Sequence, residues 1–204
     1  MEKVLDERSI VVLGSSELSF SNSPAYPPKL FNYGNSDFNM VLMGSGYFQC
    51  IPQAINVGAL SNNTKNNKIV LIISPQWFTH DGLTSESFCS RFEETNFVEF
   101  LKNDSISKET RIAVANRVNE LLTSDPTALA RVEKDERLYI DGSLNLLTRL
   151  EMAAYNSFRA EKAKFETAHA LKSQDLPIEQ ERYVKAEDIN WNELMLKSAD
   201  LGVE

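Results

Sequence analysis

Three short runs of apolar residues divide the first part of the chain, and each run is closed by glycine or proline. They occupy residues 10–13, 40–43 and 69–73. Unbroken apolar runs of this length are typical of strands, and the first run suits a central parallel strand that is covered on both faces. A helical pattern over residues 47–60 joins the second run to the third. The pattern predicts an α/β fold in which this chain supplies three parallel strands.

The chain changes character after residue 83, and no strand pattern follows up to residue 190. Thr84 and Asp125-Pro126 mark helix starts, because Thr and Asp cap helices and proline suits the first helical position. Further helices are expected over residues 105–123 and 142–172. The longest one carries apolar residues at helical spacing that we expect to form a packing surface: Leu146, Leu147, Leu150, Ala154, Phe158, Phe165 and Ala168.

This change predicts three segments. Residues 1–83 form the N-terminal part of an α/β domain, residues 84–190 form a large helical insertion or cap packed on the sheet, and residues 191–204 begin a return to the α/β domain. With 204 residues, of which 42% are apolar, the chain is long enough to bury a real core. It is neither disordered nor fibrous in composition.

Candidate chemistry gathers where the three strands end. The carboxyl ends of parallel strands share one edge of the sheet, so Ser16, the backbone amides of Gly44 and Gly46, and the side chain of Gln76 are expected close together. A hydroxyl nucleophile beside amide donors for an oxyanion is the equipment of acyl transfer. The alternative is an ordinary βα turn in which a serine caps the following helix.

Charge and cysteine content narrow the classes of function. The net charge is −8 and the basic residues form no run, which argues against nucleic acid as a partner. Cys50 and Cys89 are too few for a disulfide scaffold or a zinc site, and we expect free thiols. No cofactor or metal ion is predicted. No apolar run approaches the roughly 18 residues that span a bilayer, so the residues alone predict a soluble chain.

Several motifs resemble known families. Gly-Ser-Ser-Glu-Leu at 14–18 resembles the first block of the SGNH (GDSL-type) hydrolase superfamily, with Ser16 at the nucleophile position. Gly44 or Gly46 resembles the second block, and Gln76 stands where the third block offers an asparagine. Ser-Pro-Gln-Trp-Phe at 74–78 and the late pattern of Trp191, Leu194, Ala199 and Gly202 are similar to the DltD family of Gram-positive bacteria, which acts in lipoteichoic acid biosynthesis.

The resemblance implies an SGNH-like fold and D-alanyl transfer to lipoteichoic acid through an acyl-enzyme on Ser16. It also implies a parent protein about twice this length, anchored on the extracytoplasmic side of the cell membrane, of which this chain is an internal fragment. Two other functions stay open. One is a binding protein that recruits a D-alanyl carrier protein or a membrane O-acyltransferase, and the other is an SGNH-type esterase or thioesterase.

The chain departs from the superfamily in one respect that concerns catalysis. SGNH enzymes take their base from an Asp-x-x-His motif, and these residues contain no such motif. His80 lies just past the third strand in Thr-His-Asp-Gly, which is typical turn chemistry. His169 lies in the longest helix and is expected to be a solvated surface residue. We therefore expect the fragment alone to be inactive.

Overall fold

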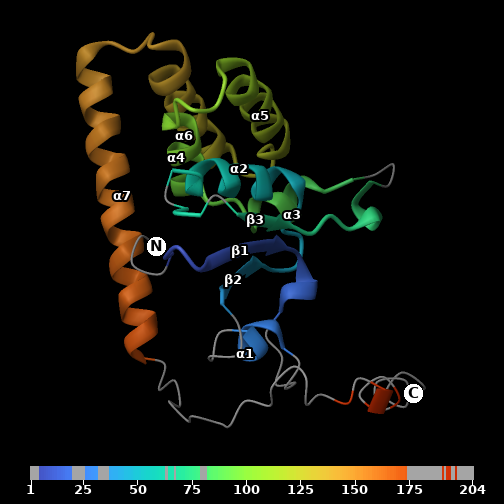
Figure 1. Cartoon of the computed structure of the whole chain (residues 1–204). Coiled ribbons are helices and arrows are strands. Elements are labelled where there is room, and N and C mark those ends of the chain that lie inside the picture. The colour runs from blue at the N-terminus through green and yellow to red at the C-terminus, as the bar shows by residue number, and fades with distance from the viewer. Residues whose placement is uncertain are drawn as a thin grey trace.

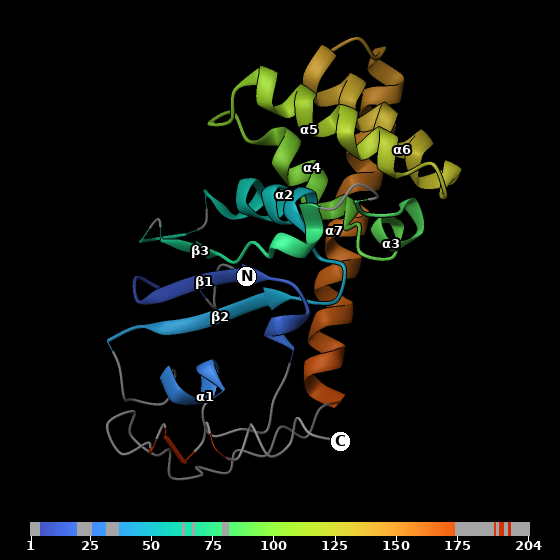
Figure 2. The ribbon, with the colours of Figure 1, turned by 90° about the vertical axis from the view of Figure 1, so that its right-hand side faces the viewer.

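A computed structural model describes residues 5–19, 26–31, 37–62, 64–66, 68–78, 82–173, 190, 192–193 and 196. Figures 1 and 2 show a small sheet at one end of the molecule and a helical part at the other, with α2 (Cys50–Leu60) between them. The mixed α/β class predicted from the apolar runs is confirmed. His80 and the late motif residues Trp191, Leu194, Ala199 and Gly202 lie outside the described residues.

The sheet has three parallel strands in the order β2-β1-β3. The strands are β1 (Ser9–Gly14), β2 (Asn39–Gly44) and β3 (Ile69–Leu71). Strand β1 is central and pairs with β2 over its full length, from Ser9 opposite Asn39 to Gly14 opposite Gly44. A short helix, α1 (Pro27–Phe31), lies against β2. Its two prolines occupy the first turn, where the missing N–H has no helical acceptor in any case.

The third strand is shorter than its apolar run suggests. All five residues 69–73 were expected in a strand, but only Ile69–Leu71 pairs with β1, although the Ile72 N–H still donates to the carbonyl O of Leu13 at 2.8 Å. Val70 of this edge strand is 45% exposed, and Ile73, just beyond its end, is 51% exposed. The third predicted strand is thus present, but it is shorter than its apolar run.

Helix α2 packs on two sides. Its residues Val57 and Leu60 join Val11 and Leu13 of β1 in a small core against the sheet. Ile55 joins the main core of the helical part. At Gly58 the approach of the neighbouring helix is so close that an added Cβ would lie 2.3 Å from Cδ2 of Phe100. The helical part thus packs on α2, and α2 packs on the sheet.

The helical part comprises α3 (Ser85–Cys89), α4 (Glu94–Lys102), α5 (Lys108–Leu121), α6 (Pro126–Glu136), the π-helical turn η3 (Arg137–Asp141) and α7 (Leu146–Ser173). Both predicted helix starts are confirmed: Thr84 accepts from the Ser87 N–H and Asp125 accepts from the Ala128 N–H at 2.9 Å. The core is built mainly from large apolar side chains of α3 to α6: Phe88, Phe97, Phe100, Leu101, Val118, Leu121, Leu122 and Val132.

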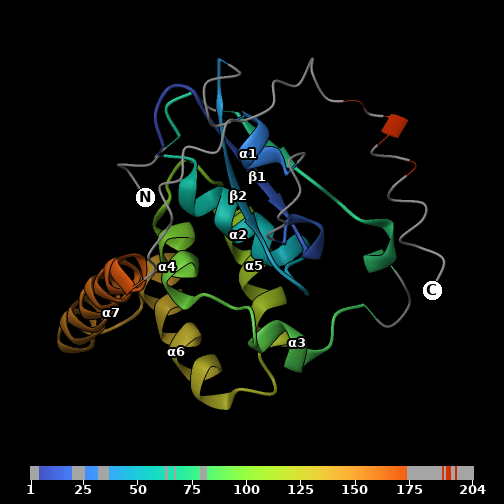
Figure 3. The ribbon, with the colours of Figure 1, turned by 90° about the horizontal axis from the view of Figure 1, so that it is seen from below.

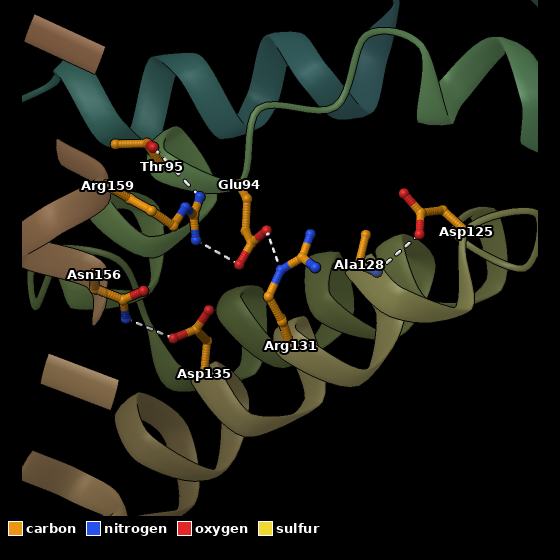
Figure 4. Close-up of polar contacts among 8 residues, drawn as sticks. All are labelled: Glu94, Thr95, Asp125, Ala128, Arg131, Asp135, Asn156 and Arg159. Atoms are coloured by element: carbon orange, nitrogen blue, oxygen red, sulfur yellow. Dashed lines mark hydrogen bonds and ion pairs between the residues drawn. The ribbon is translucent and has the colours of Figure 1, made fainter. Parts of the chain in front are cut away.

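Helix α7 is held by a polar contact surface, shown in Figure 4. Glu94 of α4 accepts from Arg131 of α6 at 2.9 Å and also pairs with Arg159 of α7. Asn156 of α7 donates from Nδ2 to Oδ1 of the fully buried Asp135 at 2.7 Å. In Figure 3, α7 accordingly lies beside α4 and α6 and apart from the strands.

The apolar stripe of α7 does not form the expected packing surface. Its large members are 61% to 77% exposed: Leu146, Leu147, Leu150, Phe158 and Phe165. The residues that pack are Met152 and Asn156, together with Arg159, on the opposite side of the helix. Among the described residues, none of the helices combines the length and hydropathy needed to cross a membrane.

Candidate functional site

The three strand ends meet at one edge of the sheet and are tied to one another. Ser15 Oγ donates to the carbonyl O of Ser45 at 3.2 Å, which joins the first corner to the second. The rings of Tyr47 and Trp77 lie with their centroids 6.4 Å apart, which joins the second corner to the third. Gln53 of α2 adds two longer contacts at 3.4 Å, from Nε2 to the carbonyl O of Phe48 and of Ile72.

The first corner separates its two serines. Ser15 is 2% exposed, whereas Ser16 is exposed at the start of the 3₁₀ turn η1 (Ser16–Leu18). The Ser15 N–H donates to Oε1 of Glu17 at 2.7 Å, so Glu17 folds back over the turn. Gly14 makes this possible, because a Cβ there would lie 2.6 Å from the same Glu17 oxygen. The buried serine and Glu17 hold the corner that presents Ser16 to solvent.

The second corner depends on a close backbone approach. A Cβ at Gly44 would lie 2.8 Å from the carbonyl O of Gly14 and 2.9 Å from that of Ser15. Gly46 has open space around its Cα, and the following Tyr47 has a positive φ of 67°, which is uncommon for a residue other than glycine. Gly44 therefore brings β2 against the first corner, and the turn that contains Gly46 bends sharply beside Ser15.

Two backbone amides at these corners make no hydrogen bond among the described residues. In the part of the chain that the structure describes, the N–H groups of Ser16 and Gly46 have no hydrogen-bond acceptor. The Leu18 N–H, by contrast, donates to the carbonyl O of Ser15 at 3.1 Å. An exposed hydroxyl with unused amide donors nearby is suited to holding a carbonyl group whose oxygen develops negative charge.

The third corner is the 3₁₀ turn η2 (Pro75–Phe78). Gln76 lies in this turn, and its side chain is outside the described part of the structure, as is His80. Trp77 has its Nε1 buried without a partner among the described residues. His169 is exposed on α7, as expected, with its ring centroid 6.4 Å from that of Phe165. Cys50 and Cys89 are free and half-buried.

Sequence reasoning missed three residues that shape these corners: Glu17, Gln53 and Arg91. Glu17 was visible in the motif at 14–18, but nothing in the pattern indicates that its carboxylate accepts from the Ser15 N–H. Arg91 gives no sequence signal, because it lies far along the chain, in the turn between α3 and α4. Its Nε nevertheless donates to the carbonyl O of Gly46 at 2.8 Å.

Comparison with known proteins shows the family of this chain. Residues 1–203 match the family described as DltD protein. The chain belongs to the DltD family. It is 26% identical over 199 residues to Protein DltD of Staphylococcus aureus (strain NCTC 8325 / PS 47), which covers 94% of this chain and 46% of that protein. It is 30% identical over 113 residues to Protein DltD of Bacillus subtilis (strain 168), covering 55% of this chain and 29% of that protein.

The DltD relatives are much longer than this chain. A third, Protein DltD of Lacticaseibacillus rhamnosus, is 25% identical over 123 residues, 60% of this chain and 29% of its own length. The chain spans less than half the length of the curated relatives it matches. The resemblance to the DltD family, drawn from the motif at 74–78 and the late pattern that begins at Trp191, is thus confirmed.

Proposed function

We propose that the protein to which this chain belongs takes part in the D-alanylation of teichoic acid, and that Ser16 carries the D-alanyl group as an acyl-enzyme. Membership of the DltD family supports the pathway. The exposed hydroxyl of Ser16, at a corner with unused amide donors, supports the serine chemistry. This second observation is the one that carries the mechanism.

The proposed reaction has two acyl transfers. Ser16 Oγ attacks the carbonyl carbon of a D-alanyl ester or thioester, and the new C–O bond forms as the hydroxyl proton passes to a base. The N–H groups of Ser16 and Gly46 donate to the resulting oxyanion. The leaving oxygen or sulfur departs with that proton, and a hydroxyl of the acceptor polymer then takes the acyl group and returns its proton to Oγ.

The base is expected in the Asp-x-x-His segment that the superfamily resemblance implies and that residues 1–204 lack. A serine hydroxyl without a base is a weak nucleophile at neutral pH. The proposal therefore assigns the nucleophile and the oxyanion donors to this chain, and the base to another part of the protein. It also places the parent protein at the extracytoplasmic face of the cell membrane, with teichoic acid, a D-alanyl carrier protein or a membrane O-acyltransferase as partners.

The decisive experiment compares the two neighbouring serines in the full-length protein. Ser16→Ala should abolish D-alanyl ester formation on teichoic acid, with little change in thermal midpoint, because the exposed hydroxyl contributes little packing. Ser15→Ala should retain much of the activity and lower the midpoint, because it removes the bond to the carbonyl O of Ser45. D-alanyl esters can be counted after mild alkaline release. Full activity in the Ser16 variant would refute the acyl-enzyme.

A recruitment function is the second candidate, and the exposed apolar stripe of α7 favours it. In that case the helical part would bind a carrier protein or membrane acyltransferase, and the serine corner would be dispensable. The same experiment separates the two functions: loss of activity in α7 variants together with full activity in the Ser16 variant would favour recruitment. An SGNH-type esterase would instead release free D-alanine without an acceptor polymer.

A further inference from the structure

One cation of the helical part reaches the strand corners. Arg91 stands between α3 and α4, and its Nε donates to the carbonyl O of Gly46 at 2.8 Å. Gly46 follows Ser45, whose carbonyl O accepts from Ser15, the neighbour of Ser16. A continuous path of contacts therefore leads from the Arg91 guanidinium to the serine corner.

The contact with Gly46 uses only one of the donors of Arg91. The side chain is exposed, and among the described residues its Nη1 and Nη2 have neither an acceptor nor a carboxylate partner. The two nitrogens keep the planar fork that binds two oxygens of a carboxylate or phosphate at once. Arg91 thus presents an uncompensated positive charge beside the second corner.

The second and third corners hold other donors without acceptors. Gln49 is 7% exposed, and its Nε2 is buried with no partner among the described residues. Trp77, whose ring contacts Tyr47, also has a buried nitrogen, Nε1, with no hydrogen-bond partner among the described residues. Gln49 also immediately precedes α2, whose first turn carries partial positive charge. The side-chain nitrogens of Gln49 and Trp77 thus lack acceptors among the described residues, and the exposed fork of Arg91 is the donor that solvent reaches.

The first corner has the opposite character. Glu17 carries a carboxylate beside Ser16, and it is exposed. A phosphate near Ser16 is therefore repelled on the Glu17 side and attracted on the Arg91 side. The whole chain has a net charge of −8, so an anionic polymer needs a local cation to approach. Arg91 supplies that cation at the corner.

We propose that Arg91 binds a phosphate group of the acceptor polymer and thereby positions a neighbouring hydroxyl of that polymer at Ser16. The inference rests on the proposed function, since it presumes an acceptor with phosphate groups. It adds a substrate-positioning residue that acts through binding and takes no part in bond formation.

The test measures binding by the 204-residue chain itself. A short synthetic glycerol phosphate oligomer is titrated calorimetrically, with a neutral glycerol oligomer as the matched ligand. Arg91→Ala should lower affinity for the phosphate oligomer by about tenfold, the usual scale of one charge-assisted contact. The slope of log affinity against log salt concentration should fall by about one. Arg91→Lys keeps the charge but loses the planar pair of nitrogens. Its affinity for the phosphate oligomer should lie between those of the unchanged chain and the Arg91→Ala chain.

Arg149→Ala is the control, because this exposed arginine belongs to α7, and Figure 1 shows α7 on the side of the sheet opposite the arrowheads of the strands. It should bind like the unchanged chain. The salt slope separates positioning from a structural role, because loss of the bond to Gly46 alone would lower the thermal midpoint and leave the salt slope unchanged. Equal affinity in the Arg91→Ala chain, equal binding of the neutral oligomer, or no binding by the unchanged chain would overturn the proposal. Because no step requires Ser16 chemistry, such a result leaves the acyl-enzyme to be judged by the serine variants.

Discussion

The buried carboxyl of Asp135 should make the stability of the helical part depend on pH. Asp135 is 0% exposed, and burial is the main cause that raises its pKa from 3.8 to about 6, with the charge of Glu94 adding to the rise and the Asn156 bond opposing it. Its Oδ1 accepts from Asn156 Nδ2, whereas Asp135 Oδ2 and Asn156 Oδ1 are buried without partners among the described residues. One proton on Oδ2 would be a donor for that second oxygen.

The sign follows from comparing the folded and unfolded chains. The unfolded carboxyl titrates near its ordinary value of about 3.9, so between about pH 4 and pH 6 the folded chain binds more protons than the unfolded one. The free energy of unfolding therefore falls as pH rises through this window and levels off above it. A shift of about two pKa units corresponds to about 3 kcal/mol.

Asp135→Asn removes the titrating carboxyl group and keeps the shape of the side chain. The variant should be more stable than the unchanged chain by about 3 kcal/mol at pH 8 and about equal to it at pH 4, because the amide supplies a donor to Asn156 Oδ1 without a charge. Urea unfolding followed by circular dichroism at several pH values measures the difference. Other groups, including the half-buried Glu136 whose pKa is also raised by burial, are present in both chains.

Asp141→Asn serves as the control, because Asp141 is exposed in the turn that follows α6. The free energy of unfolding of the Asp141→Asn chain should equal that of the unchanged chain at every pH. A stability difference between the Asp135→Asn chain and the unchanged chain that stays constant from pH 4 to pH 8 would refute the reasoning. So would a variant that is less stable at pH 8.

Three further substitutions test particular contacts. Gly58→Ala should lower the free energy of unfolding by about 1–3 kcal/mol through overlap with Phe100, whereas Gly46→Ala, with open space around it, should not; equal urea midpoints would contradict this. Asp125→Ala should lower the free energy of unfolding by about 1 kcal/mol, because it removes a helix cap that Asp125→Asn preserves. An equal decrease in the two variants would show that the cap is unimportant. Replacing Phe158 and Phe165 by serine should reduce self-association in light scattering without lowering stability, because both rings are exposed, and unchanged association would count against the stripe.

The features that sequence could predict are those set by near neighbours. Thr84 and Asp125 cap helices because each oxygen reaches an N–H three residues ahead. The strand ends meet because parallel strands pair in register, as Gly14 and Gly44 do. The nucleophile corner itself could be placed, although its catalytic role stays a prediction.

The features that sequence could not predict depend on distant partners. The packing face of α7 carries Asn156 and Arg159, and polar residues of this kind predict an exposed face. In the structure they pair with Asp135 and Glu94 of neighbouring helices. Hydrophobic periodicity therefore selected the opposite face. The position of Arg91 could not be predicted either, because its partner is the carbonyl of Gly46, which is distant in the sequence.

The double-sided packing of α2 has a consequence for dissecting the protein. A cut after residue 83 would leave Ile55 and the Gly58 surface in water on one piece, and would remove part of the wall around Phe100 on the other. Asn103 would lose its bonds to the carbonyl O of Gly58 and to Ser61 Oγ, both at 2.7 Å. The small core against the sheet lies within residues 1–83, but the main core would lose Ile55, so a limited-proteolysis map should show the two pieces released together and not as separately stable products. We therefore expect the serine corner and the turn that holds Arg91 to unfold together as one cooperative unit.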